Sequence, residues 1–234
     1  EFIAAALRED VGAGDYSTLA AIASDAKGKA VLLLKEPGVL AGMEVAKNIF
    51  EYLEPEAVFT PLKKDGDRME IGDRAFEVEA KIHTILTGER LVLNCMQRMS
   101  GIATLTATYV KLLEGYKTKI LDTRKTTPLF RQMEKDAVLI GGGSNHRMGL
   151  YDMIMLKDNH IDFCGGIAAA IAKTKEYLAA NNLDLPIEVE TRKIADVRQV
   201  LKEGGVHRIM FDNFDADAVG RAVMLIDGRY ELEA

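Results

Sequence analysis

Residues 187–190, Ile-Glu-Val-Glu, and residues 208–213, Arg-Ile-Met-Phe-Asp-Asn, carry the pattern that decides the fold: a short apolar run that ends in polar residues. The pattern recurs at residues 153–160, Met-Ile-Met-Leu-Lys-Asp-Asn-His, and at residues 119–127, which end in Asp-Thr-Arg-Lys-Thr-Thr. The apolar runs predict strands at residues 119–121, 153–156, 187–189 and 208–211. Stretches with helical spacing of apolar residues predict helices between and after them, at about residues 129–139, 165–181, 194–203 and 215–226. Alternating short strands and helices predict a parallel sheet with crossover helices, either open or closed into a barrel.

The polar ends of the runs favour a barrel, because barrel enzymes carry their chemistry after the strands. No helix opens with the glycine-rich phosphate loop of dinucleotide-binding folds. About five strands are visible, counting a last one near residues 230–232, whereas a complete eight-fold barrel takes about 200 residues or more. We therefore expect either an open sheet or a chain whose last barrel strands are missing.

The first half of the chain is organised differently. Three strands and one helix are expected, at residues 29–35, 57–63, 75–83 and 43–53. A longer helical pattern runs from Thr87 to about Leu113, with a break predicted at Ser100-Gly101. This organisation predicts an N-terminal α+β domain over residues 1–103, which includes a linking helix, and an α/β barrel domain over residues 104–234.

Composition excludes several classes of protein. The net charge of -6 and the pI near 5.4 argue against a general nucleic-acid binder, which usually carries a basic face. No run approaches the roughly 18 to 20 apolar residues that span a bilayer. Cys95 and Cys164 form no CxxC pair and no disulfide framework, so we expect buried small hydrophobes in a reducing compartment. These features predict a cytoplasmic protein without nucleic-acid or membrane partners.

The short polar segments that follow the apolar runs are called strings here. Each string that carries cations allows a chemical and a structural interpretation. Arg124 offers a planar fork and Lys125 a point charge, which suit an anionic ligand, but the string could also be a solvated loop that caps the next helix. His146 and Arg147 follow a glycine run and could donate to a carboxylate, or belong to a connector. Lys157 at a barrel mouth is a ligand cation or a Schiff-base amine, unless its neighbours only cap a helix.

The acidic strings point to a metal or a sugar. Glu188 and Glu190 share one face of their strand, because side chains repeat every two residues. Asp212 ends the next strand, so Glu190 and Asp212 could lie side by side and hold Mg²⁺ or accept sugar hydroxyls. The alternative is that these carboxylates are buried partners of Lys125 and Lys157, and the two interpretations are compatible.

Taken together, the strings resemble quinolinate phosphoribosyltransferase, also called carboxylating nicotinate-nucleotide pyrophosphorylase. The motifs that carry the resemblance are, in chain order, Glu9-Asp10-x-Gly-x-Gly-Asp15, Gly88-Glu89-Arg90, Ser100-Gly101-Ile102-Ala103, Asp122-Thr-Arg-Lys-Thr-Thr-Pro128, Gly-Gly-Gly-x-Asn-His-Arg147, Lys157-Asp-Asn-His160, Glu188-Val-Glu190 and Asp212-Asn213. The family implies an N-terminal α+β sandwich followed by an irregular, seven-stranded α/β barrel. It also implies transfer of phosphoribosyl from phosphoribosyl pyrophosphate to quinolinate with decarboxylation, giving nicotinate mononucleotide, pyrophosphate and CO₂ in de novo NAD biosynthesis.

The resemblance also implies roles for residues at matching positions. The two quinolinate carboxylates would be held by Arg124, His146 and Arg147. Arg90, a surface charge by pattern alone, would reach in from the neighbouring subunit of a homodimer. The expected catalytic set is Lys125 and Lys157 among the anionic groups of the ligands, and Glu190 and Asp212 at the ribose hydroxyls and Mg²⁺. Glu190 is our candidate for stabilising an oxocarbenium-like transition state.

Some positions depart from the family pattern. Leu129 stands where the family commonly has Gly, and Asp136 where an aromatic is common; both are expected to be helix positions that tune packing near the site. Residues 231–234 match the lead-in to a Ser-Gly-Gly phosphate loop, so we expect the C-terminal strands and that loop to be missing. The alternatives are a paralogous phosphoribosyltransferase acting on another anionic ring acid, or a non-catalytic anion-binding protein.

Overall fold

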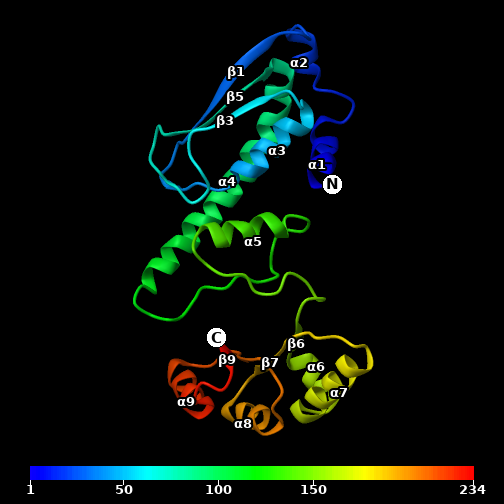
Figure 1. Cartoon of the computed structure of the whole chain (residues 1–234), viewed down its shortest axis with the longest axis vertical. Helices are drawn as coiled ribbons and strands as arrows, with labels where there is room; N and C mark the ends of the chain where they lie inside the picture. The colour runs from blue at the N-terminus through cyan, green and yellow to red at the C-terminus, as the bar shows by residue number, and fades with distance from the viewer. The chain divides into compact units, whose positions relative to one another are not determined.

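The computed structural model describes residues 1–234, which form two compact units, Glu1–His146 and Arg147–Ala234 (Figure 1). None of the helices combines the length and the apolar character that a membrane span requires. Both cysteines are free thiols; Cys95 is buried, and burial raises its pKa to about 11. The expectation of a buried small hydrophobe is confirmed for Cys95, whereas Cys164 is only half-buried.

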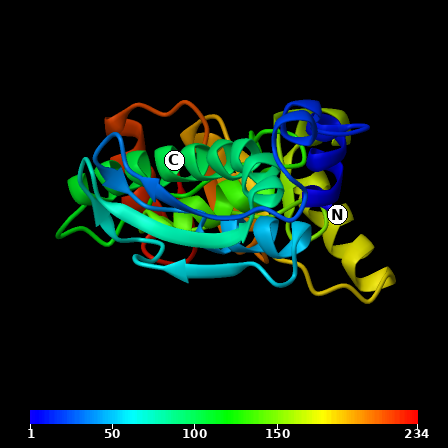
Figure 2. The ribbon, with the colours of Figure 1, turned by 90° about the horizontal axis from the view of Figure 1, so that it is seen from above.

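The first unit contains a three-stranded antiparallel sheet with the order β1-β5-β3 and a two-stranded pair, β2-β4. The strands are β1 (Lys27–Leu33), β2 (Gly38–Val39), β3 (Val58–Pro61), β4 (Arg68–Met69) and β5 (Arg74–Lys81), and the helices are α1 (Phe2–Val11), α2 (Tyr16–Ala21), α3 (Met43–Leu53), α4 (Ile82–Leu112) and α5 (Arg131–Ile140). Figure 2 shows the blue and cyan strands of the sheet lying along α4. The expected N-terminal mixture of a small sheet and helices is confirmed.

Alternation along β5 builds the core of this unit. Phe76, Val78 and Ala80 are buried on one face, as the alternating sequence predicts. The Phe76 ring lies 4.5 Å from that of Phe59 on β3 and 6.2 Å from that of Phe50 on α3, measured between ring centroids. The sheet therefore presents its apolar face to the helices.

The predicted break at Ser100-Gly101 is wrong, because α4 continues through it as one helix. The Ser100 hydroxyl accepts from the Ala41 N–H at 3.0 Å and donates to the Ala41 carbonyl at 3.2 Å. One turn further, the Thr104 hydroxyl accepts from the Val39 N–H at 2.8 Å. These contacts and the packing of buried residues on α4 offset the cost of a mid-helix glycine, about 1 kcal/mol.

Regular structure is sparse between α4 and the second unit. The predicted strand at residues 119–121 is wrong: only an isolated parallel bridge joins Leu121 and Ser144. The Ser144 N–H donates to the Ile120 carbonyl at 2.8 Å, and the Asp122 N–H donates to the Ser144 carbonyl at 3.2 Å. One bridge satisfies too few backbone groups to make a strand, so the loops on either side of α5 depend on other contacts.

The second unit is a four-stranded parallel sheet in sequential order, β6-β7-β8-β9. Its strands are β6 (Ile154–Leu156), β7 (Ile187–Thr191), β8 (Arg208–Phe211) and β9 (Glu231–Glu233), and its helices are α6 (Asp158–Cys164), α7 (Ile167–Ala180), α8 (Ile194–Glu203) and α9 (Ala216–Ile226). The predicted alternation of parallel strands and helices is confirmed.

All four helices of this unit pack on one face of its sheet (Figure 1). Val189, Ile209 and Phe211 belong to that face and share a single apolar core with the helices. The opposite face carries Glu188 and Glu190, in register with Arg208 and Met210. Doubly wound sheets place helices on both faces, whereas barrels place them on one, so the arrangement favours the barrel. Closure into a barrel stays a prediction.

Candidate functional site

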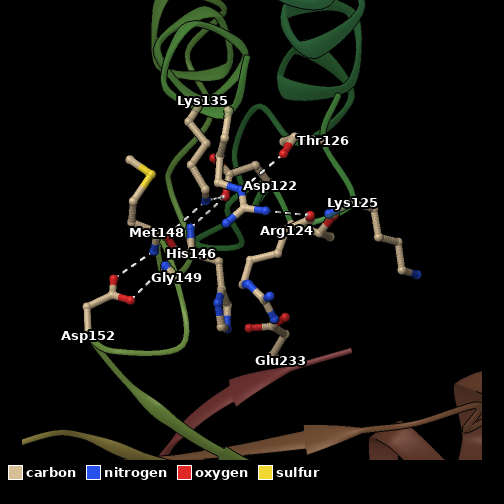
Figure 3. A network of polar contacts seen from close by, with 12 residues as sticks. Asp122, Arg124, Lys125, Thr126, Lys135, His146, Met148, Gly149, Asp152 and Glu233 are labelled. Carbon is tan, nitrogen blue, oxygen red and sulfur yellow. Dashed lines mark hydrogen bonds and ion pairs between the residues drawn. The ribbon is translucent and has the colours of Figure 1, made fainter. Parts of the chain in front are cut away.

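The carboxylate of Asp122 gathers two loops of the first unit (Figure 3). Lys135, on α5, forms an ion pair with Asp122 Oδ1, and its Nζ also donates to the His146 carbonyl at 3.0 Å. The His146 N–H donates to the same Oδ1 at 2.9 Å. The side-chain amide nitrogen of Asn145 donates to Asp122 Oδ2 at 2.6 Å and to the Lys135 carbonyl at 3.0 Å. The loop that carries Arg124 and the loop that carries His146 are thus tied to one buried charge pair.

A second set of contacts fixes the backbone of the Arg124 loop. Arg131 Nε donates to the Thr126 hydroxyl at 3.0 Å, and Arg131 Nη2 donates to the Arg124 carbonyl at 3.4 Å. Glu134 accepts from the Thr127 N–H at 3.3 Å and from Nε of Arg98, on α4, at 2.9 Å. Burial by itself raises the pKa of Glu134, but hydrogen bonds from the side chain of Thr127, from Arg98 and from the Thr127 N–H, together with the charge of Arg98, bring it below its ordinary value. The first turn of α5 therefore holds the backbone of the Arg124 loop.

The cations of this cluster are placed differently. Nε of Arg124 is buried and has no hydrogen-bond partner, which is costly for a guanidinium unless a ligand or water supplies an acceptor. Lys125 is exposed, and Figure 3 shows its side chain extending away from the Asp122 network. His146 is half-buried, with both of its backbone polar groups held. The cluster can offer an anion one planar fork, one point charge and one imidazole.

In the second unit, Glu190 and Asp212 stand at the carboxyl ends of neighbouring parallel strands. The Asp212 N–H extends the ladder by donating to the Thr191 carbonyl at 2.9 Å. Burial raises the pKa of Glu190 above its ordinary value, and the charge of Asp212 raises it further. The charge of Lys157 and a hydrogen bond from the Asp158 N–H act in the opposite direction. These four residues therefore lie close enough to act on one another.

Glu190 and Asp212 fit a divalent cation. Mg²⁺ prefers carboxylate oxygens and keeps several waters, so two carboxylates at the edge of a sheet are a suitable donor set. The mutual repulsion that already raises the pKa of Glu190 would be relieved by a cation between the two groups. When bound, Mg²⁺ would neutralise charge on a phosphorylated ligand at this edge.

Arg147 opens the second unit on a tight turn. Its side chain is buried, and Nη1 donates to the Met153 carbonyl at 3.1 Å. Asp152 closes the turn by accepting from the Met148 and Gly149 N–H groups at 2.6 and 2.9 Å (Figure 3). Burial by itself raises the pKa of Asp152, but these hydrogen bonds and the charge of Arg147 bring it below its ordinary value. The Arg147 guanidinium is thus held by a turn that the negatively charged carboxylate of Asp152 closes.

The face of the sheet opposite the helices carries a further charged cluster, centred on Arg208. Its guanidinium lies 3.6 Å from Glu188, 2.8 Å from Glu231 and 3.1 Å from Glu233. Glu188 is fully buried. Register explains the cluster, because Glu188, Arg208 and Glu231 are direct neighbours on three adjacent strands. This part of the sheet is held by charge as well as by its ladder.

Family models match almost the whole chain. The model described as Quinolinate phosphoribosyl transferase, N-terminal domain, covers residues 15–100, and the model described as Quinolinate phosphoribosyl transferase, C-terminal domain, covers residues 102–233. The chain belongs to the quinolinate phosphoribosyltransferase family. The resemblance carried by the sequence motifs is therefore confirmed.

Relatives of this family are similar over nearly the full chain. The chloroplastic nicotinate-nucleotide pyrophosphorylase (carboxylating) of Arabidopsis thaliana is 45% identical over 98% of this chain and 70% of its own length. The probable nicotinate-nucleotide pyrophosphorylase (carboxylating) of Bacillus subtilis is 40% identical over 97% of this chain and 76% of its own length. Among solved structures, NadC from Streptococcus pyogenes superposes with a TM-score of 0.92 at 42% identity, covering 99% of this chain and 80% of that one.

The structure distributes the family's expected site residues over both units. Arg124, Lys125 and His146 lie in the first unit, and Arg147 is the first residue of the second. Lys157, Glu190 and Asp212 lie together at the strand edge of the second unit. Arg90 is not among them: it lies exposed on α4, and its side chain makes no ion pair or hydrogen bond. The roles of all eight residues stay predictions.

Quinolinate phosphoribosyltransferase motifs did not point to Lys135 or Arg208, the two cations that organise the clusters. Lys135 belongs to the buried face of α5, but Arg131, Gln132 and Asp136 surround it in sequence and hide that face. Arg208 lies opposite Glu188 in the register of β7 and β8. This pairing can be recognised only when the order of the strands is known. The domain boundary at 103/104 stays a prediction; the two family models meet at residues 100 and 102, inside α4.

Leu129, where the family commonly has Gly, is not a helix position as expected. It lies in the turn before α5 with φ of 62°, and it is 90% exposed. The Phe130 N–H donates to the Thr127 carbonyl at 3.1 Å across this turn, with Pro128 at the second position. A positive φ at the third position of such a turn favours glycine, which explains the family pattern.

Proposed function

We propose that this chain transfers the phosphoribosyl group of phosphoribosyl pyrophosphate to quinolinate with loss of CO₂, giving nicotinate mononucleotide and pyrophosphate for NAD biosynthesis. The curated relatives carry this activity in their names, and the family models cover both domains. In the reaction, the bond from ribose C1 to the pyrophosphate oxygen breaks and a bond to the pyridine nitrogen forms. The ring carbon that loses CO₂ takes up a proton.

One structural observation carries the proposal: Glu190, Asp212 and Lys157 lie together at the carboxyl edge of the parallel sheet. Burial and the charge of Asp212 raise the pKa of the Glu190 carboxyl there. Parallel α/β proteins place their chemistry at this edge. A carboxylate there can stabilise positive charge that develops at ribose C1. Lys157 offers a cation to the leaving pyrophosphate. A Schiff base is not required for this chemistry.

The cations of the chain match the charge of the substrate. Quinolinate carries two adjacent carboxylates, and Arg124, His146 and Arg147 supply donors of the kind that bind carboxylates. Arg124 has a buried Nε that lacks an acceptor, and Arg147 is buried in a preformed turn. Lys125 adds an exposed point charge for the phosphate groups. In a protein with a net charge of -6, local concentrations of positive charge are needed to attract anions.

We further propose a homodimer to which Arg90 contributes across the interface. The position of Arg90 supports this proposal, because the residue is exposed and its side chain makes no hydrogen bond or ion pair within its own chain. Mutant complementation tests it: when Arg90→Ala subunits are mixed with Arg147→Ala subunits, each hybrid dimer should carry one intact site out of two. Random exchange in an equal mixture should therefore restore about a quarter of wild-type activity, because about half of the dimers are hybrids. Absence of any recovery after subunit exchange would contradict the shared site.

A cytoplasmic location is also proposed. The two free thiols support a reducing compartment. The names of some relatives, in contrast, specify chloroplasts or mitochondria. Fractionation of the source cells, followed by detection of the native protein, distinguishes these compartments.

The activity is tested by release of CO₂ from quinolinate labelled in the carboxylate next to the ring nitrogen. Release should require both phosphoribosyl pyrophosphate and Mg²⁺, and nicotinate mononucleotide should accumulate at the same rate. No turnover with both present would overturn the proposal. Calorimetric titration with Mg²⁺ in the presence of pyrophosphate provides a separate test of the metal, since Asp212→Asn should weaken the metal-dependent heat.

A further inference from the structure

Lys135 and Asp122 form a charge pair that none of the proposed substrate contacts uses. Lys135 has no exposed surface, and the side chain of Asp122 is 6% exposed. Buried ion pairs are costly to desolvate and are often replaceable by apolar residues without loss of stability. A pair at this depth therefore calls for an explanation other than stability.

The contacts of the pair converge on the backbone of His146. Asp122 Oδ1 accepts from the His146 N–H at 2.9 Å, and Lys135 Nζ donates to the His146 carbonyl at 3.0 Å. Neither backbone group of His146 belongs to a helix or strand. Two charged side chains thus take the place of a secondary-structure ladder and fix the peptide groups on both sides of the imidazole (Figure 3).

The same pair is linked to the Arg124 loop by the chain itself. Asp122 lies two residues before Arg124, and Lys135 lies on α5, whose Arg131 holds the Arg124 carbonyl. Any shift of the pair would therefore move His146 and Arg124 relative to each other. A dicarboxylate with adjacent carboxyl groups requires a defined spacing between the donors that hold it.

We propose that Lys135 and Asp122 are positioning residues, which act on quinolinate binding through the backbone of His146 by keeping the imidazole at a fixed distance from Arg124. Lys135 also balances the charge of Asp122, so that the pair adds no net negative charge beside the proposed anion site. This inference rests on the proposed function, because it assigns a role in binding the same substrate.

A double-mutant cycle separates positioning from mere stabilisation. Lys135→Met, which removes the charge at similar length, should weaken quinolinate binding on the order of 10- to 100-fold in direct calorimetric titration. His146→Ala should weaken binding by itself. If Lys135 acts through His146, the double variant should bind no more weakly than His146→Ala alone, because coupled residues are non-additive. Additive losses, or an affinity of Lys135→Met within twofold of wild type, would overturn the inference.

Matched variants guard against misfolding as an explanation. Ala137→Gly changes a fully buried residue of the same helix without touching the pair, and should lower the melting temperature while leaving quinolinate affinity within about twofold. A parallel loss of affinity in Ala137→Gly would point to general loosening of α5 and refute the positioning role. Should Lys135→Met fail to fold, Asp122→Asn, which keeps the shape of its side chain, takes its place in the cycle.

The inference and the proposed function can fail separately. If the wild-type protein binds no quinolinate, the proposed function fails. If the wild type binds and turns over quinolinate while the cycle is additive, only the positioning role of Lys135 and Asp122 is refuted.

Discussion

The two charged clusters of this protein are held in place by different means. The cluster in the first unit stands on irregular backbone, where one helix and one isolated bridge are the only regular structure between α4 and residue 146. Its geometry depends on side chains such as Asp122 and Lys135. The cluster in the second unit stands at strand ends, where the ladder of β7 and β8 already fixes Glu190 and Asp212. Neutralising a charge should therefore disrupt the first cluster and leave the geometry of the second intact.

Asp122→Ala should have the largest effect on stability. It leaves the Lys135 ammonium buried and unpaired and frees the His146 N–H, so we expect the free energy of unfolding to fall by about 3 to 5 kcal/mol. Urea denaturation followed by circular dichroism measures it. A loss below about 1 kcal/mol would show that the irregular loops do not depend on this pair.

Arg147→Ala should produce a large effect on binding. Removing a buried cation from the proposed site for two carboxylates should weaken quinolinate binding by about 2 to 5 kcal/mol. Equilibrium dialysis with labelled quinolinate gives the affinity. Arg221→Ala on α9 is the matched control, since it removes an exposed guanidinium of the same unit and should leave the affinity unchanged.

Glu190→Gln should reduce catalysis and preserve the fold. The variant keeps the size of the side chain but removes the negative charge proposed to stabilise the transition state, so kcat should fall on the order of 100-fold. The KM for quinolinate should change little, since other residues are proposed to bind the ring. Steady-state kinetics decide the question, and an unchanged kcat would remove Glu190 from the catalytic set.

The same carboxyl should also shape the pH dependence of stability. Because the pKa of Glu190 is raised in the folded protein, its ionised form disfavours folding above that pKa, and the penalty disappears as the pH falls through it. Glu190→Gln should therefore melt higher than wild type at pH 7, by about 1 to 3 °C, with the gap closing toward pH 4. Calorimetric scans across this range measure the gap.

Asp152→Asn is the control of opposite sign. The pKa of Asp152 is lowered by the N–H groups of its turn, so its ionised form stabilises the fold above the unfolded pKa, and that contribution is lost as the pH falls through the folded pKa. This variant should melt lower than wild type at pH 7 and approach it in acid. Equal pH profiles for the two variants would contradict both assignments.

Leu129→Gly should have the smallest effect. The side chain is exposed, so little burial is lost, while the positive φ of the turn no longer carries a Cβ. We expect stabilisation by about 0.5 to 1 kcal/mol, reduced by the added freedom of glycine in the unfolded chain. Chemical denaturation detects it, and destabilisation would indicate that Leu129 makes contacts in solution.

Sequence patterns predicted the sheet of the second unit better than the loops of the first. The helix at Ile194–Glu203 and the strand at Arg208–Phe211 were predicted at their observed bounds, because apolar spacing and flanking glycines mark them locally. The strand predicted at residues 119–121 and the break in α4 were wrong, because each depends on a partner distant in sequence, Ser144 and Ala41.

The same distinction applies to the candidate site. Glu190 and Asp212 could be placed side by side from period-two alternation and strand ends, and the raised pKa of Glu190 agrees with that placement. Lys135 could not be found, since its role arises only when Asp122 and His146 fold around it. The assignment of roles to these residues came from the family resemblance and awaits the experiments above.

The continuity of α4 determines where chimaeras of this family can be joined. At 31 residues the helix is about 46 Å long, and the boundary between the two family models falls inside it. A graft made at that boundary would have to splice two helices from different parents in phase, with Ser100 and Thr104 still facing their partners on the neighbouring backbone. A crossover placed after Leu112 would inherit the helix whole, so recombination should tolerate that junction better than the one that domain alignment suggests.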